Sequence, residues 1–68
     1  MVKFGTLKDF NAAKKMIKDS GIDFTVTNGD LVRKITDKDG TEILSIARLR
    51  GTTWAFRYNP IYFVEVAL

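Results

Sequence analysis

Three glycine-containing turn signals divide residues 22–58 into four short segments, and this spacing constrains the fold more than any other feature. The signals are Asn28-Gly29, the sequence DKDG at 37–40, and Gly51-Thr52. Asn-Gly is the strongest short hairpin signal, because both central residues of a type I′ turn need positive φ. Gly40 suits the left-handed position of a three-residue loop that forms a bulge. The turns predict antiparallel strands over residues 22–27, 30–36, 42–50 and 53–58.

These turns also predict which side chains share a face of the sheet, because directly opposed residues point to the same side. The expected pairs include Val26 with Leu31, Ile35 with Ile43, and Ala47 with Phe56. One face then collects the apolar side chains of Ile22, Phe24, Val26, Leu31, Ile35, Ile43, Ala47, Leu49, Trp54, Phe56 and Tyr58. Three turns chosen by local chemistry give one coherent apolar face, and this agreement supports the assignment.

Arg33 is the exception on this predicted core face, where it is expected across from Phe24 and Ser45. Its aliphatic stem could lie along apolar surface with the head directed outward, which is the interpretation that we favour. A cation–π contact with Tyr58 or Trp54 and a register error of one residue are the alternatives.

A helix is predicted over residues 7–20. Thr6 is a suitable N-cap, and Asp9 stands three residues later at capping-box spacing. Leu7, Phe10, Ala13 and Ile17 form a stripe at helical spacing. Gly21 follows as a left-handed C-terminal stop. We expect this helix to cover the apolar face of the sheet.

The C-terminal run IYFVEVAL predicts a fifth strand over residues 61–66 that is apolar on both sides. A strand of this kind is either covered on both faces or is an interaction surface. The predicted fold is therefore α+β: one domain, residues 1–68, with an N-terminal helix packed on one face of a five-stranded, mostly antiparallel meander sheet. That sheet is either open or curled toward a small barrel.

The composition excludes most catalytic and metal-binding chemistry. The chain has no cysteine and no histidine, so Cys/His metal sites and the usual bases and thiol nucleophiles are absent. Asp37 and Asp39 are adjacent carboxylates, but both are expected to bond their own backbone in the DKDG turn. We therefore expect no enzyme activity, no cofactor and no metal. No apolar stretch reaches the ~20 residues of a membrane span, and a cytoplasmic location is expected.

The second face of the predicted sheet is too apolar for a solvated surface. The predicted protein-binding residues are Val32, Leu44, Ile46, Tyr62 and Val64, with Lys34, Arg48 and Arg57 setting orientation and association rate. The leading hypothesis is a small non-enzymatic binding module. Its partner would be a second copy or a larger protein that it adapts or inhibits, as accessory proteins of phages and mobile elements do.

Nucleic-acid binding is the alternative, since the net charge is +3 with 11 basic and 8 acidic residues. The cations expected to contact phosphates are Lys34, Arg48 and Arg57, together with the helix lysines Lys14, Lys15 and Lys18. Trp54, Phe56 and Tyr58 are expected in the core, and so they are not expected to stack on bases. A steep loss of affinity with salt would distinguish nucleic-acid binding from apolar protein contact.

Overall fold

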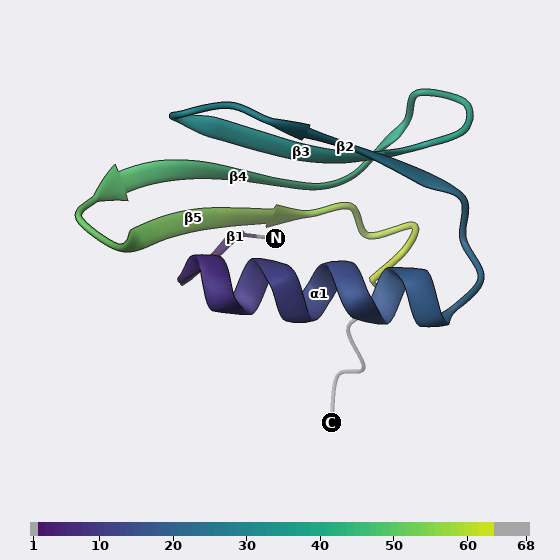
Figure 1. Cartoon of the computed structure of the whole chain (residues 1–68), viewed down its shortest axis with the longest axis horizontal. Coiled ribbons are helices and arrows are strands. Elements are labelled where there is room, and N and C mark those ends of the chain that lie inside the picture. Colours follow the sequence, from purple (N-terminus) through teal and green to yellow (C-terminus); the bar gives the residue numbers. More distant parts are fainter. Residues whose placement is uncertain (1, 64–68) are drawn as a thin grey trace.

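The structure, a computed structural model, describes residues 2–63, which form one helix against an open, antiparallel five-stranded sheet (Figure 1). The elements are β1 (Val2–Gly5), α1 (Leu7–Asp19), β2 (Phe24–Asn28), β3 (Val32–Asp37), β4 (Glu42–Arg50) and β5 (Thr53–Tyr58). The strand order is β1-β5-β4-β3-β2, so β1 and β2 are the two edges. Because α1 connects these edges, it crosses the sheet and covers one face. The predicted α+β class and mostly antiparallel meander are confirmed, and of the two forms considered for the sheet the structure has the open one.

Local sequence signals set both ends of α1, as predicted. The Thr6 amide donates to Asp9 Oδ2 at 2.8 Å, and the Thr6 hydroxyl donates to the same oxygen at 3.2 Å. At the other end Ser20 is the C-cap and Gly21 has a φ of 78°. Phe10 and Ile17 are buried against the sheet, whereas Met16 is exposed.

The first hairpin differs from the Asn28-Gly29 turn that the sequence predicts. Phe24 pairs with Asp37, Val26 with Ile35, and Asn28 with Arg33, and the Gly29 amide donates to the Val32 carbonyl at 2.9 Å. The turn is therefore centred on residues 30 and 31, and neither Asn28 nor Gly29 has positive φ. The pairing is displaced by an even number of residues, so the predicted faces of β2 and β3 survive.

Two bulges in β4 overturn the predicted register of the central strand. In the β3–β4 pair the register shifts between Ile35 and Thr36, where Ile43 is an extra residue in β4. In the β4–β5 pair it shifts between Arg48 and Arg50. Between the bulges, Ile46 lies opposite both Arg33 and Phe56, and Leu44 lies opposite both Ile35 and Tyr58.

A one-residue displacement exchanges the two faces of a strand. Leu44 and Ile46 therefore belong to the core, with exposed fractions of 0% and 1%. Ala47, predicted inward, is exposed, and so are Leu31 and Leu49. The prediction that Leu44 and Ile46 form an outer surface is wrong.

Among the described residues the fifth strand is β1, which the sequence analysis missed. Residues 60–63 form a turn, in which the amides of Tyr62 and Phe63 both donate to the Asn59 carbonyl at 3.0 Å. Phe63 then packs edge-on against Tyr58 at 4.8 Å between ring centroids. The remainder of the predicted strand, residues 64–66, lies outside the described residues.

The core lies between α1 and the sheet. Its buried members are Phe10, Ile17, Ile35, Ile43, Leu44, Ile46, Trp54 and Phe56. Half-buried apolar side chains surround this cluster, among them Phe24, Val26, Tyr58 and Tyr62. The core therefore contains the predicted aromatic face of the sheet, together with Leu44 and Ile46, which were predicted on the opposite face.

Candidate binding surfaces

The face of the sheet turned away from α1, called here the outer face, carries a row of apolar side chains across four strands. Phe4 pairs with Ala55, Ala55 with Ala47, and Ala47 with Val32. The two ends of this row, Phe4 and Val32, are 71% and 44% exposed. Ala47 and Ala55 lie between them, and their small side chains make the centre of the row shallow. We call these four residues the apolar row.

Cations border the apolar row on both sides. On one side Arg57 pairs with Ser45, and Ser45 with Lys34. On the other side Arg50 pairs with Thr53. Among the described strand residues, the acidic side chain on this face is Glu42, which pairs with Thr36 at the far end. The outer face therefore combines a flat apolar centre with a basic border.

The predicted protein-binding residues do not form one surface. Of the apolar set, Val32 lies on the outer face, whereas Leu44 and Ile46 are buried under α1. Tyr62 is half-buried and donates its hydroxyl to an Asp37 carboxylate oxygen. Val64 lies outside the described residues.

The predicted phosphate-binding cations are also divided. Lys34 and Arg57 lie on the outer face, but Arg48 pairs with Trp54 and so lies on the side of α1. Lys14, Lys15 and Lys18 belong to α1, in the other layer of the molecule. The Lys14 ammonium group stands 5.9 Å from the centroid of the Phe10 ring. A single nucleic-acid strand on the outer face would therefore contact two of these six cations.

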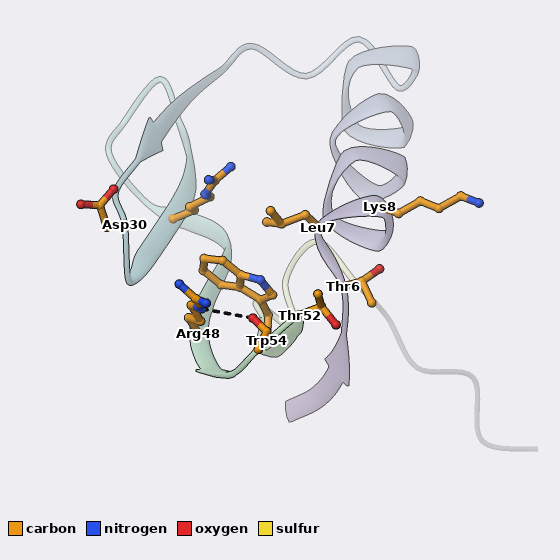
Figure 2. A pocket seen from close by; sticks show the side chains of 9 residues that line it. Thr6, Leu7, Lys8, Asp30, Arg48, Thr52 and Trp54 are labelled. Atoms are coloured by element: carbon orange, nitrogen blue, oxygen red, sulfur yellow. Dashed lines mark hydrogen bonds between the residues drawn. The ribbon is translucent and has the colours of Figure 1, made fainter.

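A second candidate surface is a pocket of about 910 Å³ at the end of the sheet beside the start of α1 (Figure 2). We call it the arginine pocket, and its lining residues are Thr6, Leu7, Lys8, Asp30, Arg33, Arg48, Gly51, Thr52 and Trp54. Figure 2 shows the Trp54 indole at its centre between Arg48 and Leu7, with the Lys8 side chain directed away. Arg48 Nε donates to the Gly51 carbonyl at 3.1 Å.

Arg33 lies on the side of the sheet facing α1, as predicted, but it stands opposite Asn28 and Ile46 and not opposite Phe24 and Ser45. Of the interpretations considered for its side chain, the structure shows the cation–π contact with Trp54 and not the favoured outward-directed head. The Arg33 guanidinium carbon stands 5.5 Å from the centroid of the Trp54 ring, in cation–π geometry. Trp54 itself is only 4% exposed. The indole is therefore unavailable for stacking on a base, in agreement with its predicted place in the core.

The carboxylates of the DKDG turn serve the turn itself. Asp37 Oδ1 accepts from the amides of Asp39 at 2.9 Å and Thr41 at 2.8 Å. The Tyr62 hydroxyl is the main cause that lowers the pKa of Asp37, and the same bond raises the pKa of Tyr62. Burial, followed by the charge of Asp9, raises the pKa of Tyr58. The bond between Tyr62 and Asp37 fastens the turn at residues 60–63 to the β3–β4 hairpin.

Within residues 2–63, no cluster of three or more acidic side chains is arranged to hold a metal ion. Nor does the described part of the chain contain a helix with the length and apolar character of a membrane span. Comparison of the chain with protein-family models, with curated proteins and with solved structures gives no significant match.

Sequence reasoning missed Phe4, the more exposed of the two ends of the apolar row. A signal existed, because Val2, Lys3 and Phe4 alternate in polarity before Gly5. Three residues are too few to predict a strand without knowing its pairing partner. The arginine pocket was missed because the predicted register placed Arg48 on the opposite face.

Proposed function

We propose that this chain is a non-enzymatic binding domain that uses its outer face to contact an acidic protein surface. The observation that carries the proposal is the apolar row, which runs in register over β1, β5, β4 and β3 without a covering element among the described residues. A contiguous apolar row that is left uncovered on the sheet of a small domain marks an interaction surface.

The size and shape of the outer face suit a protein contact. Five strands at about 4.8 Å spacing make the face roughly 19 Å wide. Phe4 is a suitable anchor, because exposed aromatic side chains contribute most to protein interfaces when a partner buries them. Ala47 and Ala55 leave a shallow floor against which a partner's larger side chain can pack.

Charge complementarity supports an acidic partner and disfavours a second copy of this chain. Lys34, Arg50 and Arg57 border the apolar row, and face-to-face pairing of two copies would bring these cations together. Like charges placed opposite each other at an interface lower affinity, whereas carboxylates on a partner raise affinity and the association rate.

Nucleic-acid binding is the second candidate, because Phe4 lies diagonal to Arg57 on an open sheet. One exposed ring and two nearby cations form a smaller platform than the aromatic sheet surfaces that bind single strands. For this reason the protein partner is preferred.

The test uses a photo-crosslinking amino acid placed at Ala47 in cells, with Asn11 on the exposed side of α1 as the matched control. We expect position 47, and not position 11, to crosslink a discrete protein. The purified partner should then bind the unmodified chain, and Phe4→Ser and Lys34→Glu should each weaken that complex at least about tenfold. Lys15→Glu, on the other layer, should change the affinity by less than about twofold.

Three results would refute the proposal. They are a crosslink between two copies of the chain, a crosslink to nucleic acid, and a protein complex that is indifferent to Phe4→Ser. Because Phe4 is exposed, Phe4→Ser should change the free energy of unfolding by less than about 0.5 kcal/mol, so lost binding is not lost folding.

A further inference from the structure

We propose that the arginine pocket binds the phosphate group of a small molecule, with Arg33 and Arg48 as its ligands. The pocket is separate from the outer face, because Arg33, Arg48 and Trp54 all lie on the side of the sheet that carries α1. This site therefore does not depend on the proposed protein contact.

The first argument is an unpaired donor of Arg33. Its Nε is buried, and no acceptor within residues 2–63 lies at hydrogen-bonding distance. A buried donor without a partner costs free energy, and the donors of a charged group cost the most. The cation–π contact with Trp54 holds this guanidinium at the wall of the pocket, where its terminal N–H groups are donors for an occupant.

The second argument is the position of Arg48. Arg33 pairs with Ile46, and Arg48 stands two residues further along β4, so the two arginines are diagonal neighbours on the same face. Such neighbours are separated by about 7–8 Å, within reach of long side chains. The bond from Nε to the Gly51 carbonyl orients Arg48 and uses one of its five N–H donors.

Two positively charged guanidinium groups that line one pocket repel each other, and an anion between them would remove this repulsion. Asp30 also lines the pocket, but Figure 2 shows its carboxylate directed away from Trp54 and Arg48. A shared oxyanion would relieve the repulsion and accept from the terminal N–H groups of both guanidinium groups.

Phosphate fits this arrangement better than a carboxylate does. One arginine fork already satisfies both oxygens of a carboxylate, whereas a phosphate offers three or more oxygens to two forks. The start of α1 adds little, since Asp9 already accepts from the Thr6 amide. The volume of about 910 Å³ leaves room for the rest of a small molecule beside Leu7 and Thr52.

The test is a titration followed by two-dimensional amide NMR at constant ionic strength, with inorganic phosphate, adenosine monophosphate and acetate as separate probes. We expect saturable shifts for phosphate and adenosine monophosphate, centred on residues 6–8 and 51–54. Arg33→Gln and Arg48→Gln should each weaken phosphate binding at least about tenfold, because each removes charged hydrogen bonds. Arg57→Gln removes the same charge from the outer face and should leave the affinity unchanged.

These variants and probes distinguish a specific phosphate site from general electrostatic attraction to a basic chain. An equal loss in all three variants would show general attraction and overturn the proposal. The same holds for acetate binding as tightly as phosphate, or for no saturable shift with either phosphate probe below about 10 mM. Arg33→Lys is the control for a folding defect, because lysine keeps the positive charge and the aliphatic stem but lacks the planar guanidinium group. This variant should stay folded and bind phosphate more weakly than the unmodified chain does.

Discussion

Truncation of Ile46 tests the register of β4, on which the division between core and outer face depends. Ile46 is 1% exposed and lies opposite Phe56 and Arg33. Removing a buried isoleucine side chain to alanine costs about 2–5 kcal/mol, because apolar contacts are lost and a cavity remains. A 68-residue domain has a total stability of about 3–10 kcal/mol, so Ile46→Ala should remove a large part of it.

The assay is urea unfolding followed by the fluorescence of Trp54, with Ile46→Val as a milder step that should cost about 0.5–1.5 kcal/mol. Val32→Ala is the matched control, because Val32 lies on the outer face and is 44% exposed; it should cost less than about 1 kcal/mol. If Ile46→Ala cost no more than Val32→Ala, Ile46 would face outward and the register would be wrong.

Three further predictions concern the turns and the helix start. Tyr62→Phe should flatten the pH dependence of stability in both acid and alkali. The lowered pKa of Asp37 stabilises the fold above about pH 4, and this contribution is lost on acidification. The raised pKa of Tyr62 stabilises the fold below about pH 10, and this contribution is lost on alkalinisation. A variant with unchanged acid and alkaline midpoints would contradict a stabilising bond between Tyr62 and Asp37. Gly29→Ala should lower the thermal midpoint measured by circular dichroism, although Gly29 does not have positive φ. The added Cβ would stand 2.5 Å from the Val32 carbonyl oxygen. An unchanged midpoint would show that the two strands do not approach each other this closely. Asp9→Ala should cost about 0.5–2 kcal/mol in urea unfolding through loss of the helix cap, whereas Asp19→Ala, at the other end of α1, should not destabilise the chain.

Features fixed by neighbouring residues could be predicted from the sequence. Thr6, Asp9 and Gly21 define α1 because capping involves residues three or four positions apart. Gly40 has a φ of 84°, and so the DKDG turn forms as its chemistry requires. Trp54 and Phe56 are buried as predicted, because β5 alternates regularly over its whole length.

The register of β4 could not be predicted from its turns, because a bulge depends on packing within the strand. Ile43 and Leu44 are adjacent, yet both are 0% exposed. Two neighbours in a regular strand point to opposite faces, so burial of both is compatible with the bulge at this position. The adjacent apolar residues Ile43 and Leu44 were the available signal of a bulge, but the register was predicted from the turns alone.

The edge strand β1 and the turn after β5 could not be predicted from neighbouring residues either. β1 has four residues and becomes a strand by pairing with β5, about 50 positions later in the sequence. The apolar run after Pro60 predicts a strand by composition, but Asn59 redirects the chain: its side-chain amide donates to the Glu42 carbonyl at 2.7 Å, and its Oδ1 accepts from the Ile61 amide. Tyr62 and Phe63 then bury part of their apolar surface in a turn.

The most direct measurement is the set of cross-strand nuclear Overhauser contacts between β4 and β5. The structure predicts that the Ile46 methyl protons contact the ring protons of Phe56, while Ala47 contacts Ala55 on the other face. Contacts between the Ala47 methyl group and the Phe56 ring, with Ile46 beside Ala55, would exchange the two faces. Both the apolar row and the arginine pocket would then be contradicted.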